Sequence, residues 1–231
     1  MEWLDLAFVL QWRILRGILV DEGGVPEEGQ TIFTTTTFNN IKMENHLFIG
    51  LGGTGGTVLR ELRKRVFEEF GSNEPPKEKV CIDYIYVDSS KSDLDDRSKW
   101  KVLGTSVHLG DAQNVNIHGI NGDVLGNLNQ YPGLQSFLPN EDVKKIQSKI
   151  GPLIKEGNGG QRRRLGRILF ANNMSSSDDD KNFVPRLKQT VKRLSESSGY
   201  QLITFHVCAG LAGGTGSGTV VDVVAQIRKH F

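Results

Sequence analysis

Apolar residues recur along this chain with two different spacings, and the spacings predict strands and helices in turn. Three short apolar runs are rich in β-branched and aromatic side chains, which is typical of buried strands. They lie at residues 46–50, 79–88 and 200–209. Apolar residues with helical spacing follow the first run, at Val58, Leu62, Val66 and Phe70. A second helical pattern follows the last run, over residues 219–231.

The middle of the chain adds further predicted helices. They cover residues 140–150 with Asn140 as N-cap, a segment that begins near Arg162, and a segment that ends at Gly199. Residues 89–140 are rich in Gly, Asn, Asp and Ser, and they give no clear element. Strands that alternate with helices predict an α/β fold, with a Rossmann-like three-layer arrangement in which helices cover both faces of a parallel sheet.

The N-terminal residues 1–42 stand apart from this pattern. Residues 1–20 are apolar but are interrupted by Asp5, Arg13 and Arg16, so we expect an amphipathic packing helix or an extension that the domain does not need. A helix on a partner or on a membrane surface is the alternative. Residues 21–42 are typical of a linker, and Met43 offers an alternative start. The predicted domain therefore covers residues 43–231.

Composition narrows the class of protein. The 231 residues are 37% hydrophobic and 24% charged, which is typical of a globular domain. The formal charge of +1 favours neither direct nucleic-acid binding nor attraction to an anionic membrane. Cys81 and Cys208 fall inside apolar runs and have no zinc-site spacing, so we expect buried, reduced thiols and a cytoplasmic location.

Two glycine-rich segments carry the candidate chemistry. Residues 50–56, "GLGGTGG", follow the first predicted strand, and residues 210–218, "GLAGGTGSG", follow the third. Glycines let a backbone approach a phosphate closely, and a helix N-terminus offers free N–H groups and a positive dipole end. Loops at the carboxyl ends of parallel strands meet at one edge of a sheet. We therefore expect the two segments to face one another around a polyphosphate.

Asp88, at the end of the second predicted strand, leaves two interpretations open. It is placed to bind ribose hydroxyls, as in NAD(P)- or FAD-binding Rossmann oxidoreductases, although it lies farther from the first glycine segment than their usual spacing. It equally suits a carboxylate that caps the next turn. Gly50, Gly52 and Gly55 satisfy the dinucleotide fingerprint, but an oxidoreductase leaves the second glycine segment unexplained.

The second segment resembles the signature loop of the tubulin/FtsZ superfamily of GTPases. Residues 212–218 match every position of its core, [SAG]-G-G-T-G-[SA]-G. The "GLGGTGG" segment is similar to the first phosphate loop of that superfamily. "GNGGQRRRLGR", at residues 157–167, resembles its γ-phosphate loop, and "YVDSS" resembles its second loop. Thr57 replaces the usual Asn, and the insert after Asp88 is long, so a divergent prokaryotic tubulin-like protein is the closest description.

The resemblance implies a GTP or GDP site, with Mg²⁺ bridging the phosphates. The implied nucleotide-binding residues are Gly52, Gly53, Thr54, Gly55, Gly56, Thr57, Asp88, Gly159, Gly160, Gln161, Gly213, Gly214, Thr215, Gly216 and Ser217. It also implies self-association into filaments, or a partner that supplies the C-terminal half. The acidic catalytic loop of the superfamily would lie beyond residue 231, so GTPase activity would need that half or a neighbouring protomer. A pseudo-GTPase scaffold is the remaining alternative.

Overall fold

A five-stranded sheet forms the centre of the computed structural model, which describes residues 7–14, 45–78, 80–118, 162–175 and 180–231. Its strand order is β1-β7-β2-β3-β6. The strands are β1 (Ala7–Ile14), β2 (Asn45–Leu51), β3 (Cys81–Asp88), β6 (Asn114–Asn116) and β7 (Ile203–Gly210). The four strands from β7 to β6 run parallel, which confirms the predicted parallel sheet.

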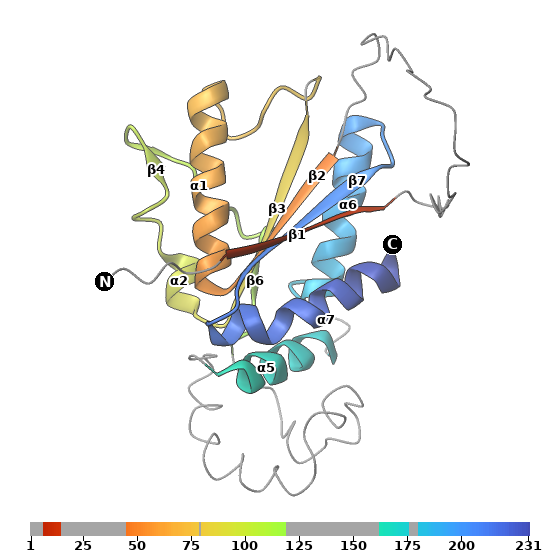
Figure 1. Cartoon of the computed structure of the whole chain (residues 1–231). Helices are drawn as coiled ribbons and strands as arrows, with labels where there is room; N and C mark the ends of the chain where they lie inside the picture. The colour runs from red at the N-terminus through yellow and green to blue at the C-terminus, as the bar shows by residue number, and fades with distance from the viewer. Residues whose placement is uncertain (1–6, 15–44, 79, 119–161, 176–179) are drawn as a thin grey trace, which may run out of the picture.

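Helices cover both faces of this sheet, as the alternation of strands and helices predicts (Figure 1). Helix α1 (Gly52–Phe70) packs on one face, and α6 (Phe183–Ser198) and α7 (Gly214–His230) pack on the other, with α5 (Arg163–Ser175) against α7. A short helix, α2 (Lys91–Asp95), follows β3. None of the described helices is long and apolar enough to cross a bilayer.

Each strand sends alternate side chains to opposite faces, so the sheet separates two apolar clusters. The larger cluster includes Ile49, Ile85 and Val207 from the strands and lies under α5, α6 and α7. The smaller cluster lies under α1 and includes Tyr84 and Trp100. Both cysteines are free and buried, as predicted.

The N-terminal segment differs from the prediction of a helix. Residues Ala7–Ile14 form β1, which pairs antiparallel with β7 from Ala7 opposite Gly210 to Ile14 opposite Ile203. Apolar residues in a short run fit a strand as well as a helix, and the partner strand β7 lies about two hundred positions away in sequence. Local spacing alone therefore could not distinguish the two.

The polar segment after β3 contains a small hairpin that the sequence did not reveal. Strands β4 (Lys101–Val102) and β5 (Thr105–Ser106) form a separate two-stranded sheet. Each strand has only two residues, too few to produce a recognisable period. The helix expected at residues 140–150 lies outside the described residues.

Candidate functional site

The two glycine-rich segments meet where β2 and β7 end. Helix α1 begins at Gly52, directly after β2, and α7 begins at Gly214, four residues after β7. The two helices leave on opposite faces of the sheet, and their first turns lie close together at its lower edge in Figure 1. This is the position at which parallel α/β sheets open a crevice for ligands. Much of each glycine-rich segment is therefore the first turn of a helix rather than a loop.

Direct contact between Gly52 and the start of α7 fixes this arrangement. Gly52 has a φ of +68°, which favours glycine, and a Cβ there would lie 3.0 Å from the backbone nitrogen of Gly216. A Cβ on Gly216 would lie 2.7 Å from the carbonyl oxygen of Leu51. The two backbones are thus too close for a side chain at either position, and the predicted juxtaposition of the segments is present.

Most of the other glycines in these segments are also explained by protein packing. A Cβ on Gly55 would lie 2.5 Å from the carbonyl oxygen of Cys208, and one on Gly56 would overlap the ring of Tyr86. A Cβ on Gly210 would lie 2.6 Å from the hydroxyl of Thr54. These glycines allow α1 to lie close against the sheet, so their presence alone does not indicate a ligand.

Gly53 and Gly213 are different, because no atom lies within 4 Å of the position of a Cβ on either residue. Each stands at the start of a helix, Gly53 in the first turn of α1 and Gly213 at the N-cap of α7. No side chain caps either helix, and neither first turn contains an acidic residue. Both starts therefore combine open space with uncapped N–H groups and a positive dipole end, an arrangement that fits phosphate.

Most hydroxyl groups of the two segments are used within the protein; that of Thr54, whose residue lines a cavity beside α1, makes no hydrogen bond with a described residue. Thr57 donates to the carbonyl of Gly53 at 3.0 Å, and Ser217 donates to the carbonyl of Gly213. The hydroxyl of Thr215 lies 2.8 Å from that of Ser89, and both residues are buried. Backbone N–H groups and the Thr54 hydroxyl are consequently the main donors that these segments offer to a ligand.

Asp88 is buried and fully engaged at the end of β3. One of its carboxylate oxygens accepts from the Tyr86 hydroxyl at 2.9 Å, and the other accepts from the Ser90 N–H at 3.1 Å. Burial raises the pKa of this carboxyl above its ordinary value, although the two hydrogen bonds oppose the shift. The structure therefore favours the turn-capping interpretation of Asp88 over a contact with ribose.

Comparisons with known proteins add independent information. The family described as "Tubulin like" matches residues 47–231. This chain belongs to the tubulin-like family. Among solved structures, CetZ1 from Haloferax volcanii, a GDP-bound monomer, is similar at 18% sequence identity and a TM-score of 0.44. The match covers 82% of this chain and 38% of CetZ1. A comparison with curated proteins finds no match.

Helix α5 holds the start of α7 in the tubulin-like chain. The Arg163 guanidinium donates to the carbonyl of Leu211 at 2.9 Å, and Arg167 makes two hydrogen bonds with Asp222, at 2.8 and 3.0 Å. A Cβ on Gly166 would overlap the carbonyl of Gly214. Arg162, Arg163 and Arg164 are all exposed, but Arg163 also contacts the segment before α7 through the Leu211 carbonyl. Gly159, Gly160 and Gln161 lie outside the described residues.

A cavity of about 560 Å³ opens beside the first turn of α1. Its lining includes Gly53, Thr54, Thr57, Arg60 and Lys99. Two cations and a helix start therefore border one space at the edge of the sheet, together with Asp93 of α2 and Asp96 just after it. Within the described residues, no group of three or more His, Cys, Asp or Glu side chains is arranged to hold a metal ion.

The sequence missed Ser89 and Arg163 as site residues. Ser89 joins the end of β3 to α7 through Thr215, and its carbonyl oxygen lies 3.0 Å from Nδ1 of His118. Its only signal in the sequence was its place in "YVDSS". Arg163 is exposed and donates to the backbone carbonyl of Leu211, a partner that lies 48 positions away and leaves no local signal.

Proposed function

We propose that this tubulin-like chain binds GTP or GDP, with the phosphates between the first turns of α1 and α7. The observation that carries the proposal is the pair of open positions at Gly53 and Gly213. Each lies at an uncapped helix start, and the contact of Gly52 with Gly216 holds the two starts together. One such start is common in proteins, but two that are held together at one edge of a sheet suit a polyphosphate.

Backbone N–H groups would hold the phosphates from two sides. Residues 52–57 would bind one part of the polyphosphate, and residues 213–217 would bind the other. Ser89 and Arg163 would keep the second of these segments in place. Mg²⁺, when bound with the nucleotide, would neutralise phosphate charge. The carboxylate that ends β3, Asp88, is buried and hydrogen-bonded, so the phosphates and water would be the main ligands of the ion.

Self-assembly and hydrolysis form the second part of the proposal. Membership of the tubulin-like family supports nucleotide-dependent assembly of this chain into a polymer or a complex. Phosphoryl transfer needs a group that orients water, and Asp88 is not free to do so. We therefore expect nucleotide binding by this chain, with turnover only when another protomer or another part of the protein supplies that group.

Isothermal titration calorimetry of the chain with GTP, GDP, ATP and NAD tests the binding site. We expect binding of GTP and GDP, and at least a tenfold loss of affinity in Gly53→Val and Gly213→Val, because a side chain there fills the space beside the N–H groups. Gly110→Val is the matched control, since Gly110 is exposed and lies away from this edge.

Two results would overturn the proposal. Binding of NAD in preference to GTP and GDP would indicate a dinucleotide-binding protein. No binding of any nucleotide at millimolar concentration would remove the proposed site altogether. Binding without hydrolysis, in the presence of partner protomers, would instead indicate a scaffold that keeps the site but not the reaction.

A further inference from the structure

Arg163 lies beside the start of α7 with its positive charge unpaired. It is the first residue of α5, and its side chain is exposed. One guanidinium nitrogen donates to the Leu211 carbonyl at 2.9 Å, just before the open position at Gly213. Among the described residues, no carboxylate forms an ion pair with Arg163. A guanidinium carries several further N–H donors, so those on Arg163 are available to a ligand.

Close packing of α5 on α7 fixes the backbone at this position. A Cβ on Gly218 would overlap the carbonyl oxygen of Arg163, so the first turns of the two helices touch. One turn further along, Arg167 forms an ion pair with Asp222 at 2.8 Å. The two helices therefore run side by side in the same direction, and both begin at the same edge of the sheet (Figure 1).

The surroundings of Arg163 hold no acidic residue that competes for it. Helix α5 contains no Asp or Glu, and neither do residues 201–221, which include β7 and the first turns of α7. The first acid after that stretch, Asp222, is already paired with Arg167. No residue of α5 or α7 lines the cavity beside α1, to which Asp93 and Asp96 belong. An anion at the start of α7 therefore meets a cation without a competing carboxylate from either helix.

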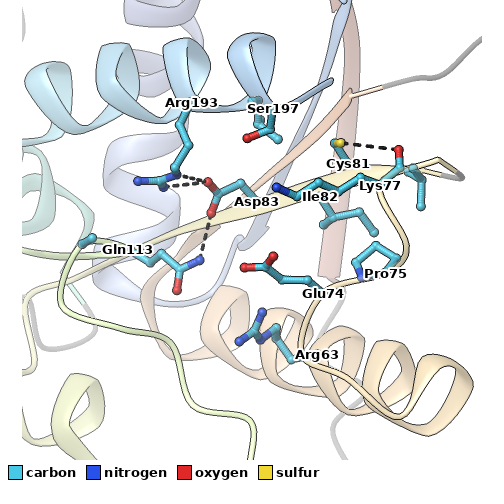
Figure 2. Close-up of a pocket in the computed structure, with 13 residues that line it drawn as sticks. Arg63, Glu74, Pro75, Lys77, Cys81, Ile82, Asp83, Gln113, Arg193 and Ser197 are labelled. Carbon is cyan, nitrogen blue, oxygen red and sulfur yellow. Dashed lines mark hydrogen bonds and ion pairs between the residues drawn. The ribbon is translucent and has the colours of Figure 1, made fainter. Parts of the chain in front are cut away.

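Arg193 shows the contrasting case of an arginine that the protein itself neutralises. Figure 2 shows Arg193 and Gln113 converging on Asp83. Two guanidinium nitrogens of Arg193 donate to one oxygen of this carboxylate, at 2.6 and 2.8 Å. In the part of the chain that the structure describes, the hydrogen-bond partner of the Arg163 guanidinium is instead a neutral carbonyl. The charge of Arg163 is therefore available for an interaction outside the folded chain.

We propose that Arg163 binds the terminal phosphate of a nucleoside triphosphate and so raises the affinity of the site for GTP relative to GDP. The first turns of α1 and α7 offer N–H groups for two phosphates, and Arg163 provides a place for a third. A terminal phosphate carries more negative charge than the inner ones and suits the planar donors of a guanidinium. The inference rests on the proposed function, because it needs the phosphates to lie between α1 and α7.

Isothermal titration calorimetry with GTP and GDP, in the presence of Mg²⁺, tests the inference on two variants. Arg163→Gln removes the charge but keeps an amide that can donate to the Leu211 carbonyl. Its affinity for GTP should fall roughly tenfold or more, while its affinity for GDP should change less than about threefold. Arg163→Lys keeps the charge without the planar donors, so its affinity for GTP should lie between those of the wild type and Arg163→Gln. Binding of GDP in each variant shows that the site is folded.

Arg65→Gln is the matched control, because Arg65 is an exposed arginine farther along α1 and its loss changes the net charge equally. Both affinities of this control should stay unchanged. An equal fall in GTP and GDP affinity in Arg163→Gln would overturn the inference, because Arg163 would then act only by holding the segment before α7. An unchanged GTP affinity would overturn it too, and both results leave the proposed function intact. A wild type that binds neither nucleotide would contradict the proposed function itself.

Discussion

The hydroxyl groups of Ser89 and Thr215 lie 2.8 Å apart in the interior of this tubulin-like chain. This hydrogen bond connects the residue after β3 with the first turn of α7, across 126 positions of sequence. Ser89 is 2% exposed and Thr215 8%, so neither hydroxyl has ready access to water as a substitute partner. The bond ties the proposed phosphate segment to the adjacent edge of the sheet.

Ser89→Ala should therefore lower the free energy of unfolding by about 1–3 kcal/mol, because it leaves the Thr215 hydroxyl buried without its partner. Adding Thr215→Val should lower the free energy of unfolding by little more, since the double variant removes both polar groups. Urea denaturation of both single variants and the double variant gives the coupling between them. Additive effects would contradict a direct bond.

Two neighbouring glycines of α1 should respond in opposite ways to alanine. Gly53→Ala should raise the free energy of unfolding by about 0.5–1 kcal/mol, because the position is open and alanine favours a helix. Gly55→Ala should lower it by about 1–3 kcal/mol, because its Cβ would meet the Cys208 carbonyl. Thermal unfolding followed by circular dichroism measures both. Equal changes in the midpoint of thermal unfolding would show that α1 does not lie as close to β7 as described.

His206 predicts a dependence of stability on pH. Burial, and then the neighbouring His46, lower its pKa from 6.5 to about 4, and a ring nitrogen of each histidine lies 2.9 Å from the other. Between these pH values the unfolded chain binds more protons than the folded one, so stability should fall as the pH falls from 6.5 to about 4. We expect a loss of roughly 1–2 kcal/mol, allowing for the water that still reaches the ring.

The variant His206→Phe isolates that contribution, because Phe48 already stacks on the His206 ring with centroids 4.2 Å apart and can stack on phenylalanine. Urea denaturation at pH 7 and pH 4.5 should show a smaller difference in the variant than in the wild type. An identical difference would assign the acid sensitivity to other groups.

Much of α1 could be predicted from the sequence, but its start and its buried face could not. Val58 and Leu62 mark a helix correctly, yet both are only partly buried. The fully buried stripe includes Gly52, Leu59 and Arg63, and its glycines and arginine do not count as apolar in a periodicity. Close packing on β7 explains the glycines, while Arg63 donates to two backbone carbonyls. These causes are tertiary and leave no local pattern.

The position of the candidate site could be predicted from the sequence, but its details could not. The two glycine-rich segments had to meet, because strands β2 and β7 are parallel and their carboxyl ends share an edge. Which glycines are open could not be inferred, since Gly53 and Gly55 look alike in sequence and differ only in what packs against them. The roles of Thr57 and Ser217 also changed, because each hydroxyl bonds the carbonyl four residues earlier in its own chain.

Hydrogen–deuterium exchange with and without GDP tests the central claim most directly, because it reports on the backbone N–H groups proposed to bind phosphate. The account predicts that GDP slows exchange in both segments, residues 52–57 and 213–217, with no comparable change in the C-terminal half of α6. Slower exchange at residues 52–57 alone would match a single-loop dinucleotide site and contradict the account, and so would a nucleotide that binds and protects neither segment.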